Sequence, residues 1–289
     1  MRVIEPSELI LNPDGSIFHL HLQPEQLAEN IILVGDPGRV KMIASFFDKL
    51  ESQTENREFV SATGRYGSKR ITALSTGIGT DNIDIVVNEL DALVNIDLKT
   101  RQVKTEHKSL KIIRIGTSGG LQGDIPVNAF LASKKAIGFD GLLNFYEGRD
   151  EISDLPFEKA FKSYVGWNEH LPSPYVVACD PALFNRLIDE EFTPGVTISA
   201  PGFYGPQGRE LRLKIVDPQI NDKIESFRFE DQRITNYEME CSAIYGLSRL
   251  LGHQSLTVCI IIANRVTKKA NEDYKPVMAK LVKKVLDRI

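Results

Sequence analysis

The sequence is poor in cysteine, has no strong excess of either charge and contains no long apolar run. Its three cysteines stand far apart and lack the CxxC spacing of a zinc or redox site. A sparse and odd number of thiols is typical of a reducing compartment, so we expect a cytoplasmic protein. The longest largely apolar run, residues 256–263, is too short to span a bilayer, and we expect no membrane partner.

Opposite charges nearly cancel along the chain, with 35 basic and 39 acidic residues and a formal net charge of −4. This balance does not favour a nucleic-acid partner, so an anionic small ligand would have to be held by individually placed arginines. Hydrophobic residues make up 42% of the chain, which suffices for a sizeable core and excludes disorder. We therefore expect a folded, globular protein.

Several common catalytic motifs are also absent. The five histidines form no HExxH-like cluster, so we predict neither a metal site nor a cofactor. No glycine loop fits GxGxxG or GxxxxGK(S/T), which argues against a dinucleotide or P-loop site. No GxSxG segment supplies an acyl-transfer nucleophile. The reaction is then more easily one in which the nucleophile comes with the substrate.

Short apolar runs followed by glycine recur at residues 31–34, 71–74 and 112–115 and are typical of buried strands. Apolar residues at three- and four-residue spacing predict helices over 40–47 and 83–94, and a closing helix that reaches the C-terminus. Residues 239–251 read as a further helix that Gly252 ends. With no break in composition, this alternation predicts a single α/β domain over residues 1–289, with a central mixed β-sheet flanked by helices. The charged segment 101–111 is predicted to be a solvated loop.

Three loops at the expected carboxyl ends of strands carry candidate anion ligands: Gly35 with Arg39, the turn 76–79, and Arg114 with Thr117. Backbone N–H groups, a hydroxyl and guanidinium groups together match the geometry and charge of a phosphate. Arg114 interrupts an otherwise apolar strand, and a buried arginine needs an anionic partner. That partner is either a bound anion or an internal carboxylate.

Eight short motifs follow one another in order: FHL at 18–20, GDPGR at 35–39, REF at 57–59, STGIG at 75–79, IIRIGTSGG at 112–120, FYGPQGR at 203–209, YEMEC at 237–241 and ANR at 263–265. From about Phe18 to the C-terminus the chain thereby resembles the nucleoside phosphorylase family, and within it the uridine phosphorylase branch. Residues 1–17 are then an N-terminal extension. The resemblance implies a pentosyltransferase in which inorganic phosphate, a co-substrate, attacks C1′ of uridine and releases uracil and ribose 1-phosphate.

The resemblance also implies a role for each motif residue. The phosphate ligands would be Gly35, Arg39, Arg57, Arg114 and Thr117, with Arg57 reaching across from a neighbouring subunit. The ribose would contact His19, also from the neighbour, together with Met239 and Glu240. The base would contact Phe203, Gln207, Arg209 and Arg265. The catalytic residues would be Arg114, Gln207, Arg209 and Glu240. Sites shared in this way imply at least a homodimer, and relatives often form homohexamers.

The chemistry of the base-site residues favours a pyrimidine. Gln207 offers both a donor and an acceptor, and Arg209 offers donors only, which complements the N3–H and carbonyl edge of uracil. Purine-specific relatives tend to carry an acidic residue near that position. A related nucleoside phosphorylase acting on deoxyuridine, thymidine or a purine nucleoside is the main alternative. A hydrolytic nucleosidase and a non-catalytic nucleoside-binding protein are the others.

Some assignments stay open at the sequence level. His21 lies beside His19, although FHL favours His19. Glu238 lies beside Glu240, so one of the two can bind ribose while the other holds a structural arginine. The segment 80–82 lacks the serine that completes a monovalent-cation site between subunits in some relatives, so no metal is carried over. Residues 199–202 also depart from the Ser-Asp pair that relatives often have.

Overall fold

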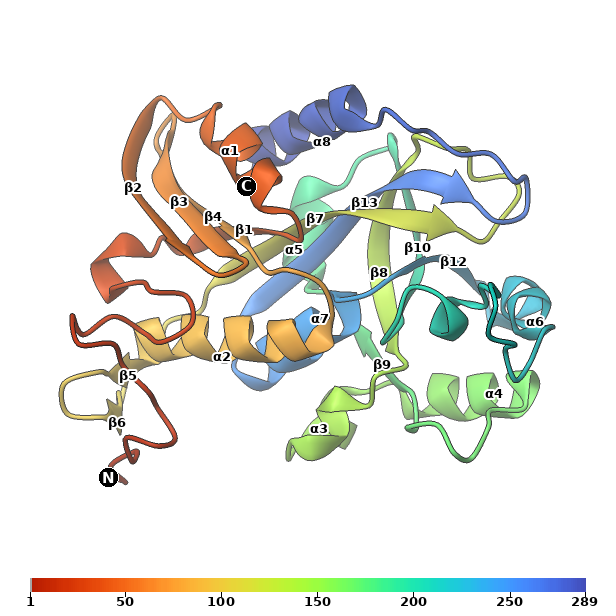
Figure 1. The fold of residues 1–289 in the computed structure, drawn as a ribbon, viewed down its shortest axis with the longest axis horizontal. Coiled ribbons are helices and arrows are strands. Elements are labelled where there is room, and N and C mark those ends of the chain that lie inside the picture. Colours follow the sequence, from red (N-terminus) through yellow and green to blue (C-terminus); the bar gives the residue numbers. More distant parts are fainter. Residues whose placement is uncertain (1) are drawn as a thin grey trace.

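The computed structural model describes residues 2–289, which form an α/β fold built on one large mixed sheet (Figure 1). Parallel strands β4 (Lys69–Ser75), β1 (Asn30–Val34), β7 (Lys111–Gly120) and β13 (Gln254–Asn264) lie side by side at its centre. The antiparallel strands β2 (Lys49–Asn56) and β3 (Phe59–Tyr66) extend it beyond β4. The predicted mixed sheet is therefore confirmed.

On the other side of β13 the sheet curls round and closes on itself. The strands there are β8 (Phe130–Gly138), β9 (Tyr175–Ala178), β10 (Phe192–Ser199), β11 (Arg228–Phe229) and β12 (Gln232–Glu238). Because β12 also pairs with the end of β7, strands β7, β13, β8, β10 and β12 make a closed ring. This closure brings the carboxyl ends of β7, β12 and β13 close together.

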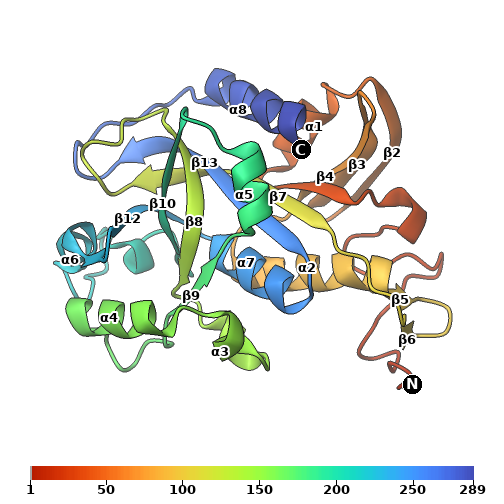
Figure 2. The ribbon, with the colours of Figure 1, turned by 180° about the vertical axis from the view of Figure 1, so that it is seen from behind.

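Helices cover both sides of the sheet (Figures 1 and 2). Helices α2 (Thr80–Asn95) and α7 (Cys241–Leu250) lie side by side on one side, and α1 (Pro37–Ala44) and α8 (Lys275–Arg288) lie on the other. The remaining helices are α3 (Arg149–Ile152), α4 (Leu155–Val165), α5 (Pro181–Leu187) and α6 (Ile220–Ser226), with single 3-10 turns at Pro24–Gln26, Leu142–Phe145 and Gly205–Gln207. No helix within residues 2–289 combines the length and the apolar character needed to cross a bilayer.

The local sequence explains the main elements. Strand β1 is a central parallel strand with helices on both sides of the sheet (Figure 1), so both of its faces are buried and its run Ile31, Ile32 and Leu33 is continuously apolar. Helix α2 buries the stripe that begins with Ile83 and Val86, as its spacing predicts. Helix α7 stops just before Gly252, whose φ of +79° suits the end of a helix.

Three segments differ from the predicted boundaries. Residues 116–120 were expected to form a glycine loop, but β7 continues through them, because the small residues let β12 and β13 pair on either side. Helix α1 ends at Ala44, three residues early, and the ring of Phe47 packs over Gly64 instead. The mostly exposed segment 101–111 contains the second strand of a short hairpin, β5 (Ile96–Asp97) and β6 (Gln102–Val103).

The N-terminal segment 2–17 packs onto the body of the protein. Leu9 and Ile17 are buried in the main core. The guanidinium of Arg101 donates to the carbonyl oxygen of Leu9 at 2.5 Å, and the amide of Ile4 donates to the Arg101 carbonyl at 2.8 Å. The segment therefore contacts the turn of the β5–β6 hairpin at Arg101.

Candidate active site

Arg114 stands at the centre of a buried cluster of opposite charges. It projects from β7, is 5% exposed, and has its Nη1 3.3 Å from Oε2 of Glu238 and its Nη2 bonded to Oε2 of Glu240. Burial opposes the charged guanidinium, but the carboxylates of Glu240 and Glu238 outweigh it and raise the pKa of Arg114. The internal-carboxylate alternative is therefore what this structure contains. The Nε of Arg114 is buried and has no partner within residues 2–289.

The two glutamates are held differently. Glu238, at the end of β12, accepts hydrogen bonds from the Ser199 hydroxyl at 2.5 Å and from the amides of Glu240 and Cys241, both at 2.9 Å. Its oxygens are thus occupied by bonds that anchor the start of α7. Burial raises the pKa of Glu238, the charge of Arg114 opposes this, and the neighbouring Glu240 adds to it.

Glu240 has more capacity to accept further hydrogen bonds. Its Oε1 accepts from the amide of Gly79 at 2.8 Å, and its Oε2 accepts from Arg114. A carboxylate offers about four acceptor sites in all. Gly79 reaches it in an unusual backbone conformation, with a φ of +99° that favours glycine. Of the two glutamates, Glu240 is therefore the one with acceptor sites left for a ligand.

The predicted phosphate ligands Gly35, Arg39 and Arg114 come together. The Nη1 of Arg39 donates to the carbonyl oxygen of Ile115, one residue beyond Arg114, at 3.3 Å. Burial, followed by repulsion from Arg114, lowers the pKa of Arg39. Its Nε lies 4.0 Å from Oδ2 of Asp36, too far for a hydrogen bond, and this buried Nε has no hydrogen-bond partner in the described chain. A Cβ on Gly35 would lie 3.3 Å from the carbonyl oxygen of Gly77, so the two glycine loops adjoin.

Thr117 and Met239 lie next to these groups in the chain. Thr117 is half-buried on β7, three residues beyond Arg114, and pairs in register with β13. Met239 is half-buried between Glu238 and Glu240. No polar contact of the Thr117 side chain is found within residues 2–289. Both residues adjoin the Arg114 cluster in the chain, and their predicted roles stay predictions.

A second polar cluster gathers the base-site candidates around Gln207, which is 3% exposed. Its Oε1 accepts from Nη1 of Arg209 at 2.7 Å and from Nη2 of Arg265 at 3.0 Å, and its carbonyl oxygen accepts from Nη1 of Arg265 at 2.6 Å. The guanidinium of Arg209 lies 3.7 Å from the centre of the Phe203 ring, which is 51% exposed. The structure thus brings all four candidates together.

Electrostatics single out this cluster. Neither Arg209 nor Arg265 lies within salt-bridge distance of a carboxylate in the described part of the chain. Burial, with repulsion from Arg209, lowers the pKa of Arg265 to about 10. Burial also lowers the pKa of Arg209. Two positive charges without a carboxylate partner are suited to a ligand that carries or acquires negative charge.

His19 and Arg57 meet at a different place. Arg57 lies in the exposed turn between β2 and β3, with a φ of +55°, and the side chain of the preceding Asn56 donates to the carbonyl oxygen of His19 at 2.8 Å. The ring of His19 is 2.6 Å from Oε1 of Glu89, whereas His21 is more exposed and faces Asp14. Within residues 2–289 neither His19 nor Arg57 bonds to the Arg114 or Gln207 clusters. Their delivery to a neighbouring subunit stays a prediction.

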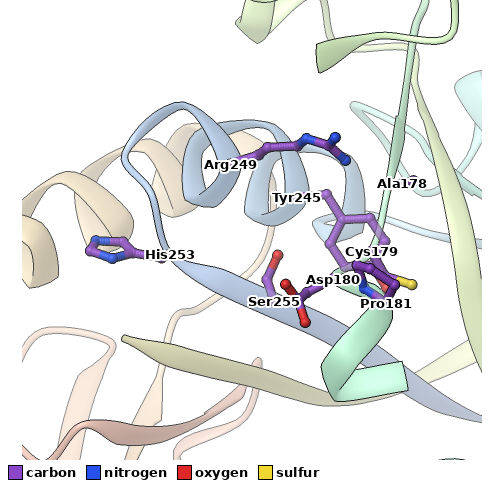
Figure 3. A pocket seen from close by; sticks show the side chains of 8 residues that line it. All are labelled: Ala178, Cys179, Asp180, Pro181, Tyr245, Arg249, His253 and Ser255. Carbon is purple, nitrogen blue, oxygen red and sulfur yellow. The ribbon is translucent and has the colours of Figure 1, made fainter. Parts of the chain in front are cut away.

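A separate cavity of about 260 Å³ opens near the start of β13, the end of the strand far from Arg265 (Figure 3). Its lining includes Asp180, Arg249, His253 and Ser255. The His253 ring is turned away from the other labelled side chains and lies 3.3 Å from Asp91. Because its polar groups do not converge, this cavity is a weaker candidate than the two clusters. No group of three or more metal-ligating side chains is found in residues 2–289.

Two contributors are not assigned a role by the sequence analysis. The amide of Gly79 and the hydroxyl of Ser199 hold Glu240 and Glu238 respectively. Gly79 belongs to a loop singled out for its glycines, so its sequence carries a signal. Ser199 belongs to the segment 199–202, but the sequence does not indicate Glu238 as its partner, because the two residues are distant in the chain.

The chain is similar to known proteins over most of its length. A family model described as the phosphorylase superfamily matches residues 29–289. The uridine phosphorylase of Thermococcus kodakarensis is 28% identical, over 94% of this chain and 87% of the relative. That of Haemophilus influenzae is 30% identical, over 88% and 89%. A purine nucleoside phosphorylase of Listeria monocytogenes is 23% identical, over 84% and 85%.

A solved structure is also similar over nearly the whole chain. It is that of a Trypanosoma brucei nucleoside phosphorylase that shows uridine phosphorylase activity, with 29% identity and a TM-score of 0.86. The match covers 97% of this chain and 98% of that one.

Proposed function

Because this chain belongs to the phosphorylase superfamily, we propose that it cleaves uridine with inorganic phosphate to give uracil and ribose 1-phosphate. Phosphate attacks C1′ directly as the glycosidic bond breaks through an oxocarbenium-like transition state. No residue of the protein forms a covalent intermediate. The work of the site is positioning and electrostatic stabilisation.

One observation supports the choice of a pyrimidine. The guanidiniums of Arg209 and Arg265, which both donate to Gln207, have no carboxylate partner in residues 2–289. Uracil departs with negative charge on its ring and carbonyl oxygens, which guanidinium donors stabilise. A departing purine is helped instead by an acid that protonates it, and no carboxylate bonds to Gln207, Arg209 or Arg265. The charge of the base cluster therefore supports an anionic pyrimidine leaving group.

Uridine has to rearrange this cluster in order to bind. Both lone pairs of the Gln207 amide oxygen are occupied by guanidiniums, so the N3–H of uracil can be accepted only when one of them withdraws. Arg209 is the looser of the two, because it lies over the exposed face of Phe203, whereas Arg265 is bound to both carbonyl oxygens of Gln207. The base displaces Arg209 and takes its place on the ring. Arg209 then donates to the base.

The buried charge cluster serves the sugar and phosphate. The free acceptor sites of Glu240 take the ribose hydroxyls, with Met239 against the sugar. Phosphate lies near Arg39 and Arg114, whose unpartnered Nε groups are spare donors, and near Gly35 and Thr117. Glu238 keeps Arg114 and the start of α7 in place.

The complete site is proposed to need a second copy of the chain. His19 and Arg57 lie close together, because the side chain of Asn56 donates to the His19 carbonyl oxygen. A symmetric neighbour can therefore supply both residues to the ribose and phosphate. This requires at least a homodimer, and a homohexamer would satisfy it as well. Three buried free cysteines support a reducing, cytoplasmic location.

A substrate panel tests the choice of base. At saturating phosphate, kcat/KM is measured for uridine, deoxyuridine, thymidine and inosine by chromatographic detection of the released base. We expect uridine to be the best substrate and inosine to be cleaved at least about 100-fold less efficiently, as a site built for one hydrogen-bond pattern rejects another. Faster cleavage of inosine would replace this proposal with a purine nucleoside phosphorylase, the activity named for the Listeria relative.

A further inference from the structure

Tyr237 lies at the border between the hydrophobic core and the base cluster. It belongs to β12, is 1% exposed, and meets Phe139 edge to face with ring centroids 6.5 Å apart. The guanidinium of Arg265 lies over its ring at 5.1 Å from the centre. This contact is a cation–π interaction, and the same guanidinium donates to the carbonyl oxygen of Gln207. The Tyr237 ring thus helps to position Arg265.

The hydroxyl of Tyr237 has no hydrogen-bond partner within residues 2–289, and neither does Nε of Arg265. A buried polar group without a partner destabilises the fold, so native structures keep few of them. The equally buried Tyr245 shows the usual arrangement. Its hydroxyl donates to the carbonyl oxygen of Ser133 at 2.6 Å and accepts from the amide of Thr257 at 2.8 Å.

The base cluster is short of acceptors. Burial raises the pKa of Tyr237, although the charges of Arg265 and Arg209 oppose this, so the phenol keeps its proton at neutral pH. The guanidiniums can only donate, and the oxygen atoms of Gln207 are already engaged. A ligand that brings a carbonyl oxygen supplies what these donors lack. Uracil carries two such oxygens.

Resting on the proposed uridine phosphorolysis, we propose that Tyr237 is a base-recognition residue whose hydroxyl donates a hydrogen bond to a carbonyl oxygen of the pyrimidine. The bond forms when the base displaces Arg209 from Gln207 and the cluster opens. It strengthens as negative charge moves onto the departing base, so it stabilises the transition state more than the bound substrate. The ring has a separate task, the support of Arg265.

Tyr237→Phe separates the two tasks, because it keeps the ring and removes only the hydroxyl. The hydroxyl is unpartnered in the free protein, so the thermal unfolding midpoint is expected to stay equal or rise. For uridine, kcat/KM is expected to fall about 10-fold, the value of one hydrogen bond to a charged group. The matched control is Tyr245→Phe, which removes two hydrogen bonds to backbone groups outside the Gln207 cluster. It is expected to lower the unfolding midpoint and to leave kcat/KM for uridine unchanged.

Sulfur-substituted substrates test the direct contact, since a thiocarbonyl is a poor acceptor. The loss caused by Tyr237→Phe is expected to shrink for either 2-thiouridine or 4-thiouridine, which identifies the carbonyl. If Tyr237→Phe causes as large a loss for both thiouridines as for uridine, the proposed bond is overturned. So would a Tyr237→Phe enzyme with unchanged kcat/KM, or one that loses activity and stability together. A wild-type protein that leaves uridine intact would instead overturn the proposed function, and this inference with it.

Discussion

Replacement of Arg209 by alanine tests the base cluster most sharply. In the free protein the guanidinium donates to the Phe203 carbonyl and to Gln207 and lies over the Phe203 ring. These contacts are half-exposed, so their loss is expected to cost at most about 1 kcal/mol of folding stability. The same donor would stabilise the departing uracil anion. Removal of one preorganised donor of this kind lowers kcat by about 100- to 1,000-fold.

The assay is steady-state release of uracil from uridine, together with a thermal unfolding curve for each variant. Fluorine at C5 of the base withdraws electrons and lowers the need for donors, so the loss is expected to be smaller for 5-fluorouridine. Arg212→Ala is the matched control, because Arg212 lies in the same segment and is exposed. An Arg209→Ala enzyme whose kcat for uridine stays within about threefold of the wild type would refute the role of this cluster in leaving-group stabilisation.

Three further predictions concern the buried charges and the loop that holds them. Glu240→Gln is expected to raise KM for uridine about 10-fold or more, since it weakens a charged acceptor of the ribose hydroxyls, which initial rates would reveal. Burial raises the pKa of Glu238 in the folded protein, so its contribution to stability is present below the pKa that it has in the unfolded chain and is lost as pH rises through the folded pKa. In urea unfolding between pH 5 and 8, the wild type should therefore lose stability relative to Glu238→Gln as pH rises. A constant difference between the two proteins would contradict this. Gly79 has a φ of +99°, and a Cβ there would lie 2.7 Å from Oδ1 of Asp81, so Gly79→Ala is expected to lower the free energy of unfolding by about 1–3 kcal/mol and to remove most of the activity. The control Gly67→Ala, in an open turn at a φ of +58°, should lower stability alone.

Much of the fold could be predicted because its central strands are buried on both faces. The runs at residues 31–34, 71–74 and 112–115 are strands as expected, and the helices after the first two runs are present. The glycines of residues 116–120 misled the prediction, since glycine serves a tight loop and a close approach of strands equally well. The comparisons confirm the resemblance to nucleoside phosphorylases, the uridine phosphorylase branch, and an enzyme of the uridine phosphorylase-like pentosyltransferase class.

The site was only partly predictable. The burial of Arg114 followed from its place within an apolar strand, but its pairing with Glu238 and Glu240 depends on how the sheet closes between β7 and β12. His19 and His21 differ in a contact that the sequence does not show, because Glu89 of helix α2 bonds to the His19 ring and to the Leu20 amide but not to His21. The unpartnered hydroxyl of Tyr237 has no sequence signal, because every buried tyrosine looks alike until its neighbours are known.

Phosphate is the proposed nucleophile, and analysis of the sugar product distinguishes it from water. Purified protein is incubated with uridine in phosphate-free buffer and in buffer with increasing phosphate, and uracil, ribose and ribose 1-phosphate are quantified together. We expect uracil release that requires phosphate, saturates with it and yields ribose 1-phosphate in equal amount. Uracil release at the same rate without phosphate, with free ribose as the second product, would exclude phosphate as the nucleophile and make the protein a hydrolase.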